Sequence, residues 1–326
     1  MSKNVFCLSL CAMLCALCVF AEAQPPEKTP RIGYLSGGGS SPPQAFMQGL
    51  RDLGYFEGKN ITIEHRTSGG KPDIDMYPDI MADLIRLKVA VVVVETSGAA
   101  LAAKKATHTI PIVMTTSTDP VGTGLIASFA RPGGNVTGLT SVSVELGGKL
   151  LELLKEIVPR LSRVVIPAPA TSRTEDLFIK ETEGPARLLK VQLIRVPVPR
   201  PEDYDGIFRV ATKERANALL VRIPASTPAR HRKRFVELAV KNRLPAIYTA
   251  INWIEAGGLI SYGQNRNDQF QRVAAYVDKI LKGAKPADLP VEAPKDFDLV
   301  INLNAAKQIG LTIPPNVLVR ADRVIK

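Results

Sequence analysis

Residues 89–107 read VAVVVVETSGAALAAKKAT. Val89–Val94 is an unbroken apolar run of mostly β-branched residues, which is typical of a strand covered on both faces of a parallel sheet. Ser97–Thr107 follows almost at once and is rich in alanine, the strongest helix former. A buried strand that leads directly into a helix is the repeating unit of an α/β protein. This stretch therefore predicts a parallel sheet with helices packed against it.

The same alternation extends in both directions from this stretch. Further strands are expected at residues 31–35, 61–66, 110–114 and 135–139, with helices from 42 to 53 and from 74 to 87. A second series begins with the amphipathic helix 145–158. Its strands are expected at 163–166, 191–196, 218–223, 246–249 and 259–262, with helices near 174–189, 202–214 and 228–243. The tail adds a helix at 269–281, a strand at 298–303 and a short helix at 304–309.

Two consecutive strand–helix series of similar size predict an α/β protein made of two Rossmann-like lobes with parallel sheets. The length of 326 residues agrees, since domains average about 150 residues. The tail is too unlike a third domain to stand alone, and we expect it to cross back and complete both lobes. The expected lobes are residues 24–140 with about 263–300, and residues 141–262 with about 301–326.

The N-terminus has the composition of an export signal. Lys3 supplies a weak positive charge, and Val5–Phe20 is an apolar run without charge. Ala21–Ala23 fits a signal-peptidase site, so residues 1–23 are the expected signal peptide, cleaved before Gln24. An uncleaved anchor is the alternative. Lipidation is disfavoured, because no small residue directly precedes a candidate cysteine.

All four cysteines lie inside that signal: Cys7, Cys11, Cys15 and Cys18. The mature chain would therefore contain no thiol. This excludes disulfides, thiol catalysis and cysteine metal sites from the expected functions of the mature protein.

The formal net charge of +11 could serve nucleic acid, an anionic membrane surface or an acidic solute. The densest cluster is Arg230–Arg234, within a predicted helix. No aromatic side chain stands among these charges, and only Phe235 lies beside them. A solvated helix face is therefore the favoured interpretation, and no nucleic-acid partner is expected.

The sequence offers no recognisable catalytic motif. The three histidines, His65, His108 and His231, are far apart, and no serine sits in G-x-S-x-G. Residues 122–127 match G-x-G-x-x-A, but a dinucleotide fingerprint should follow the first strand, and this one follows the fourth. We expect no enzyme activity, no cofactor and no metal, although a triad assembled from distant residues stays open.

Small polar residues follow several predicted strands. In the first series these are residues 36–41, 95–97 and 115–119; in the second they are 168–172, 224–227, 248–249 and 262–263. Ligands of open α/β sheets bind outside the carboxyl ends of the strands. Two such edges facing each other would form a polar binding cleft.

Six segments together resemble one family closely, the substrate-binding proteins of ABC transporters that include the tryptophan-binding branch. They are LGYFEGKN (53–60), DPVG (119–122), ARPGGNVTG (130–138), LPAIY (244–248), AGGLISYG (256–263) and LKGAKP (281–286). The resemblance spans about residues 31–325. It implies a type I periplasmic-binding-protein fold, with three crossings between the lobes and the solute between them.

Two strand ends depart from the family pattern. Thr96-Ser97-Gly98 stands where the family often has Gly-Thr-Pro, and Pro167-Ala168-Pro169 where it often has Trp-Asn-Pro. An aromatic amino-acid specificity is therefore not carried over. Glu95, which precedes the first departure, could meet an amine on the ligand or cap the following helix.

The resemblance and the strand ends together indicate a ligand site, with hinge strands near Leu139–Val142, Ile260–Gly263 and Val300–Asn302. The predicted ligand-binding residues are Ser36, Thr96, Ser97, Thr116, Asp119 and Tyr248. Asp119 could bind an amine or serve an Asp-Pro turn.

The expected protein is a monomeric periplasmic receptor that delivers a small polar solute, such as an amino acid, to an ABC permease. A sensory binding protein and, less favoured, an exported α/β hydrolase are the alternatives.

Overall fold

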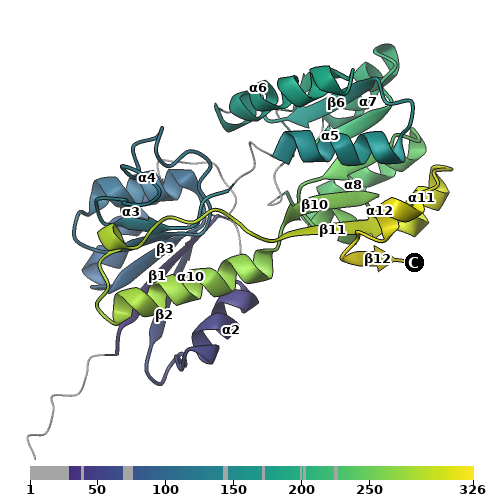
Figure 1. Cartoon of the computed structure of the whole chain (residues 1–326). Helices are drawn as coiled ribbons and strands as arrows, with labels where there is room; N and C mark the ends of the chain where they lie inside the picture. Colours follow the sequence, from purple (N-terminus) through teal and green to yellow (C-terminus); the bar gives the residue numbers. More distant parts are fainter. Residues whose placement is uncertain are drawn as a thin grey trace, which may run out of the picture.

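Two separate β-sheets form the framework of the protein (Figure 1). The computed structural model describes residues 29–37, 40–68, 76–141, 146–170, 173–198, 200, 203–223 and 227–326. The predicted signal peptide lies outside these residues. The two sheets and their covering helices make two lobes, which confirms the predicted α/β architecture.

The first sheet has the strand order β2-β1-β3-β4-β5, and all of its pairings are parallel. Its strands are β1 (Arg31–Ser36), β2 (Thr62–Thr67), β3 (Val91–Val94), β4 (Ile112–Met114) and β5 (Val136–Gly138). Its helices are α2 (Gln44–Asp52), α3 (Tyr77–Arg86), α4 (Ser97–Ala106), α10 (Arg266–Leu281) and the short 3-10 helix η3 (Pro286–Asp288). Every residue of β3 is buried, as the unbroken valine run predicts.

The second sheet has the order β12-β11-β10-β9-β8-β6-β7. Its strands are β6 (Arg163–Ala168), β7 (Gln192–Pro197), β8 (Ala218–Val221), β9 (Ala246–Tyr248), β10 (Ile260–Gln264), β11 (Phe297–Asn302) and β12 (Arg323–Ile325). Its helices are α5 (Leu146–Ile157), α6 (Arg173–Leu188), α7 (Tyr204–Lys213), α8 (Ala229–Lys241), α9 (Asn252–Glu255), α11 (Leu303–Gln308) and α12 (Pro315–Leu318). Only β10 and β11 pair antiparallel among the described strands.

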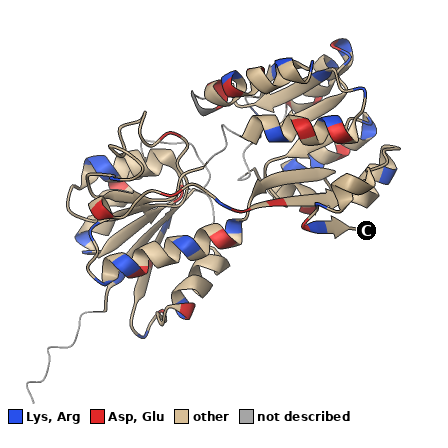
Figure 2. Ribbon diagram, viewed as in Figure 1, with Lys and Arg blue, Asp and Glu red and all other residues tan. Residues whose placement is uncertain are grey.

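Each sheet is sandwiched between two apolar clusters. In the first lobe, Met81 and Leu84 of α3 pack on one face, while Phe46 of α2 and Val273 of α10 pack on the other. The second lobe repeats this plan, with α5 and α6 on one face and α7 and α8 on the other. Charged residues lie mostly on the helices around the sheets, and the strands carry few (Figure 2).

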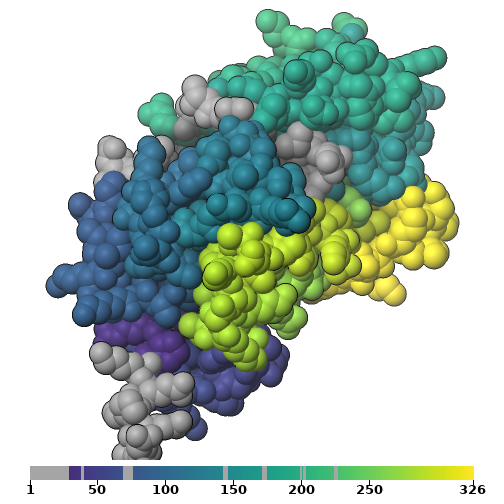
Figure 3. Space-filling view, turned by 60° about the vertical axis from the view of Figure 1, so that its left-hand side comes forward, coloured from purple at the N-terminus to yellow at the C-terminus, as the bar shows by residue number. Residues whose placement is uncertain are grey.

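Helix α10 belongs to the first lobe although it follows a strand of the second. It packs along α2, where a Cβ on Gly49 would come within 2.9 Å of the Ala274 Cβ, so the glycine lets the helices approach closely. In the space-filling view the segment of α10 covers the first lobe and continues to the C-terminal elements of the second (Figure 3).

The chain crosses between the lobes after β5, between β10 and α10, and before β11. Ile260–Gly263 and Val300–Asn302, predicted as hinge strands, lie inside the second sheet, where they pair with each other. The crossings therefore fall outside these segments, at Gln264–Asn265 and near Asp296, where the Asn265 N–H donates to the Asp296 carbonyl oxygen at 3.2 Å.

The predicted first hinge segment, 139–142, coincides with the crossing after β5 up to residue 141; Val142 lies outside the described residues. Leu139 forms a parallel bridge with Glu292, on the strand that returns towards β11. The Thr140 N–H donates to the Glu292 carbonyl oxygen at 2.9 Å. Two of the three crossings are therefore hydrogen-bonded to each other.

Candidate ligand-binding site

The crossings fix which edge of each sheet borders the other lobe. The chain leaves the first lobe from the carboxyl end of β5 and re-enters it from the carboxyl end of β10. Since the first sheet is parallel, the carboxyl ends of its other strands lie on the same side as that of β5. Strands β6, β7, β8 and β9 are likewise parallel to β10. Each carboxyl edge therefore lies on the side where the chain passes to the other lobe.

Glu95 is the central acidic group of the first edge. It follows β3, is half-buried, and accepts a hydrogen bond from the Tyr34 hydroxyl at 2.7 Å and from the Gly37 N–H at 3.1 Å. Burial, followed by the charge of Glu95, raises the pKa of Tyr34 well above its ordinary value, so this tyrosine remains a donor. Two internal donors thus hold the carboxylate at the end of β3.

Ser36, a predicted ligand residue, lies below the surface of this edge. Only 1% of it is exposed, and its Oγ is 2.9 Å from Nε2 of His65 on β2. Burial lowers the pKa of His65, opposed by Glu95 and aided by Arg66, so the imidazole favours its neutral form. Ser36 therefore supports the edge from within and offers almost no surface to a solute.

Thr96 and Ser97 begin helix α4. The Thr96 Oγ1 accepts the Ala99 N–H at 3.1 Å and lies 3.2 Å from the Tyr77 hydroxyl, so Thr96 caps the helix. The Ser97 Oγ donates to Ser117 Oγ at 3.4 Å. Glu95 is thus not the cap of α4, which removes one of its two sequence-based roles. The helix start also directs main-chain N–H groups towards this edge, a geometry suited to an anion.

Thr116 and Asp119 follow β4. Thr116 is half-buried and makes no side-chain hydrogen bond within the described residues, so its hydroxyl is available to a ligand. The Asp119 Oδ1 instead accepts the Gly122 N–H at 2.8 Å, and its carbonyl oxygen accepts the Thr123 N–H at 3.0 Å. This geometry is that of a turn, so the structure favours the turn role of Asp119 over the amine-binding role.

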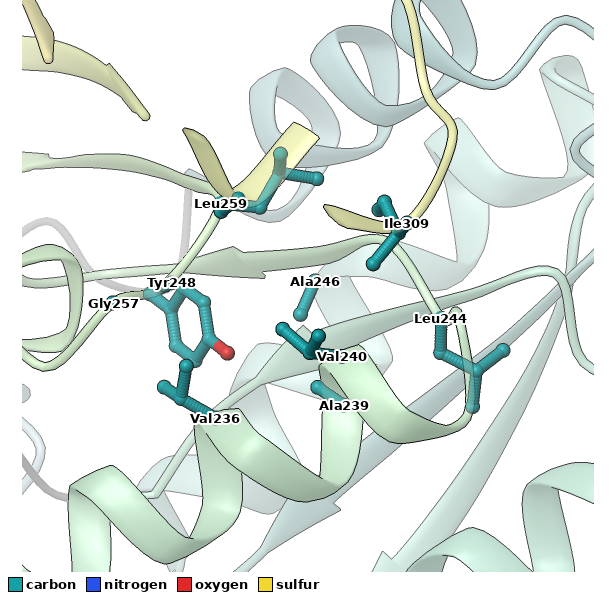
Figure 4. A pocket seen from close by; sticks show the side chains of 11 residues that line it. Val236, Ala239, Val240, Leu244, Ala246, Tyr248, Gly257, Leu259 and Ile309 are labelled. Atoms are coloured by element: carbon teal, nitrogen blue, oxygen red, sulfur yellow. The ribbon is translucent and has the colours of Figure 1, made fainter. Parts of the chain in front are cut away.

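Tyr248 lies elsewhere than predicted. It is 1% exposed and stacks on Trp253, with ring centroids 5.2 Å apart and planes 13° apart. Its ring points between α8 and β10 into a small cavity with Val236, Ala239 and Leu259 (Figure 4). Alternate side chains of a strand face opposite sides of the sheet. The Tyr248 side chain is on the side covered by α8, so it points into the core and not towards the carboxyl edge. The prediction of Tyr248 as a cleft residue is therefore wrong for this structure.

The second edge holds a buried ion pair that the sequence reasoning missed. Arg222 directly follows β8, and its Nε and Nη2 donate to the two carboxylate oxygens of Glu175, each at 2.8 Å. The guanidinium carbon lies 4.1 Å from the centroid of the Phe178 ring. An arginine directly after a buried strand could have indicated a functional residue at this edge. The predicted strand 218–223 included Arg222, whereas β8 ends at Val221.

A groove described by the structure lies away from both edges. Its volume is about 500 Å³, between α8 and α11, and its lining includes Gly257 at the amino end of β10. The cavity beside Tyr248 also reaches that end of the strand. Within the described ranges, no three His, Cys, Asp or Glu side chains come together as a metal site requires. Nor does any described helix have the length and apolarity to cross a bilayer.

Comparison with known proteins settles the family. The family model for ABC transporter substrate-binding proteins matches residues 41–325 of this chain. The chain belongs to the ABC transporter substrate-binding protein family. The resemblance drawn from the six sequence segments is thereby confirmed.

Relatives of this substrate-binding protein include amino-acid binders. A tyrosine-binding protein of Clostridioides difficile is 22% identical over 276 residues, which cover 82% of this chain and 76% of the relative. The ABC domain from Streptococcus pneumonia, solved in complex with L-Trp, has a TM-score of 0.81 at 26% identity, covering 91% of this chain and all of that one. A conserved domain protein from Vibrio cholerae matches with the same TM-score and coverage at 28% identity. These matches establish the type I periplasmic-binding-protein fold.

Proposed function

We propose that this protein is an extracytoplasmic receptor that binds an amino acid or a related polar solute between its lobes and delivers it to an ABC permease. The observation that carries the proposal is the pair of carboxyl edges, each on the crossing side of its lobe, in a chain of the substrate-binding family. Two relatives, a tyrosine-binding protein and a protein solved in complex with L-Trp, support an amino-acid ligand.

The expected mechanism is closure of the lobes on the solute by rotation at the three crossings. Hinge closure around a ligand is an established mode of domain motion. The ligand favours the closed state only through contacts that the open state lacks. In the first lobe we assign those contacts to Glu95, Thr116 and the start of α4, with Glu95 accepting an ammonium group.

A ligand screen tests the binding function. The purified protein is mixed with the L-amino acids, organic acids, nucleosides and sugars, and its thermal unfolding is recorded. A solute that binds only the folded state stabilises the protein, by about 2.7 kcal/mol at 100 times its Kd. The melting temperature rises as a result. Failure of every solute to raise the melting temperature would refute the receptor function, and turnover of a solute would favour the hydrolase alternative.

A variant pair tests the role of Glu95. Glu95→Gln should weaken binding of an amine-bearing hit about 10-fold or more, because a charge-assisted hydrogen bond is replaced by a neutral one. Glu152→Gln, on the exposed side of α5, is the matched control, since among the described residues Glu152 pairs only with Lys149, at 3.3 Å. Equal affinities of the two variants would remove Glu95 from the site.

Delivery and location need separate measurements. Uptake of the identified solute by cells with and without the gene distinguishes transport from sensing. Fractionation of cells, with mass measurement of the N-terminus, tests export and cleavage before Gln24. Sedimentation of the purified protein tests the expected monomer.

A further inference from the structure

We propose that Arg222 binds a carboxylate group of the solute. This inference rests on the proposed receptor function and extends it by naming the chemical class of the ligand.

Arg222 stands at the edge that borders the first lobe. It is the first residue after β8, and its N–H donates to the Pro167 carbonyl oxygen of β6 at 3.0 Å, so its backbone is still fixed by the sheet. Its side chain reaches Glu175, in the first turn of α6, and Phe178, one turn later. That helix begins at the carboxyl edge, so the guanidinium lies at the same edge.

Two neighbours fix the guanidinium in one orientation. Glu175 accepts hydrogen bonds from Nε and Nη2. The Phe178 ring covers one face of the guanidinium, with its centroid 4.1 Å from the guanidinium carbon. Only 9% of Arg222 is exposed. A planar guanidinium held on one side by a carboxylate and on one face by a ring cannot change its direction without losing both contacts. It is therefore pre-organised, which lowers the entropy lost when a ligand binds.

The guanidinium of Arg222 has N–H groups that Glu175 does not accept. It carries five N–H groups, and Nε and Nη2 each donate one of them to Glu175. Nη1 donates no hydrogen bond to any described residue. Three N–H groups therefore remain, two on Nη1 and one on Nη2. One N–H from each of these nitrogens can donate to the two oxygens of a carboxylate that approaches the end of the guanidinium.

The implied ligand is a small solute with a carboxylate. Glu175 already balances the charge of Arg222, but the ordered fork and the nearby start of α6 still favour a negative group. Glu95 offers the opposite charge on the first lobe. An α-amino acid carries both groups, so closure of the lobes would bring its two charges to Glu95 and Arg222.

The test compares each acid with its amide. Isothermal titration calorimetry measures the affinity of the protein for each acid and for its amide. The pairs are L-tyrosine and L-tyrosinamide, L-tryptophan and L-tryptophanamide, benzoate and benzamide, and each further acid found in the screen with its amide. We expect the acid to bind about 100-fold more tightly than its amide, as for loss of a charged partner in a desolvated pair. An amide that binds as tightly as its acid, or a best ligand without a carboxylate, would overturn the inference.

Variants locate the effect at Arg222. Removing one member of a buried ion pair can unfold the lobe, so the test variant is Glu175→Gln/Arg222→Met, which removes both charges. It should bind acid and amide with similar affinity. The control Arg163→Gln lies at the opposite, amino end of β6, where Arg163 donates to the Glu214 carbonyl oxygen at 3.1 Å. It should keep the full preference for the acid.

The outcomes separate the two proposals. A double variant that still prefers the acid 100-fold refutes the role of Arg222 and leaves the receptor function standing. A screen in which no acid, amide, sugar or nucleoside binds refutes the receptor function, and this inference falls with it.

Discussion

Two substitutions of Tyr248 distinguish a core residue from a ligand residue. The side chain is 1% exposed, stacked on Trp253 and in edge contact with Phe235, whose ring centroid is 6.5 Å away. Its hydroxyl makes no hydrogen bond with any described residue and faces the small cavity of Figure 4. Tyr248→Ala and Tyr248→Phe therefore remove different things: the first the whole ring, the second only an unpaired hydroxyl.

The expected free-energy changes differ several-fold. Replacing a buried aromatic side chain by alanine costs about 3–5 kcal/mol, and the aromatic stack adds about 0.5–1.5 kcal/mol beyond its buried area. Removing a buried hydroxyl without a partner should change stability by less than about 1 kcal/mol, because no hydrogen bond is lost. The pKa of Tyr248 is raised by burial, so the hydroxyl stays protonated across the ordinary pH range.

Urea unfolding of both variants, with titration of a solute found in the screen, provides the assay. Tyr248→Ala should lower the free energy of unfolding of the second lobe by the amounts above. Tyr248→Phe should bind the solute with the affinity of the unmodified protein. A ten-fold loss of affinity in Tyr248→Phe, with stability unchanged, would refute the reasoning and return Tyr248 to the ligand site.

Three further predictions follow from particular contacts. Arg222→Met alone should lower the free energy of unfolding by about 3–5 kcal/mol, whereas Glu175→Gln/Arg222→Met should be near neutral; equal losses in urea unfolding would contradict a coupled pair. Gly138→Ala should destabilise the first lobe by more than about 2 kcal/mol, because φ is +119° and the new Cβ would lie 2.3 Å from a main-chain oxygen of β4. Gly134→Ala, with open space around its Cβ, is the control, and similar melting temperatures of the two variants would disprove the strain. Since burial lowers the pKa of His65 below 6.5, the unfolded chain binds the proton first on acidification, and stability should fall as the pH drops below 6.5. His65→Gln should reduce that slope in unfolding curves recorded from pH 7.5 to 5; parallel curves would contradict it.

Much of the fold follows from local patterns. The valine run of β3 predicts a strand buried on both faces, and all four residues are buried. The helices near 174–189, 202–214 and 228–243 agree with α6, α7 and α8 within a few residues. Such elements are predictable because their periodicity reports the burial of their own side chains.

The antiparallel pairing of β11 was not predicted. It depends on which neighbour the returning chain meets, and no residue of β11 encodes that neighbour locally. The hinge segments predicted near 260–263 and 300–302 lie beside the crossings and not on them for the same reason, since pairing across distant segments makes them strand interiors.

The ligand site, too, has features that local patterns predict and features that depend on tertiary packing. The sequence by itself determined that polar residues such as Thr96 and Thr116 follow the strands, because a strand–helix junction is a local pattern. Only the tertiary structure decided which of these side chains are available. It buried Ser36 against His65, tied Asp119 to its own turn and turned Tyr248 into the core.

Arg222 shows the physical reason most clearly. Its place after a buried strand is a property of the sequence, but its contact with Glu175 joins residues 47 positions apart. Whether an arginine is solvated, paired or left with a free fork depends on the side chains that folding brings around it. The sequence therefore determined the two lobes and their polar edges, while the packing of distant segments decided which groups can meet a ligand.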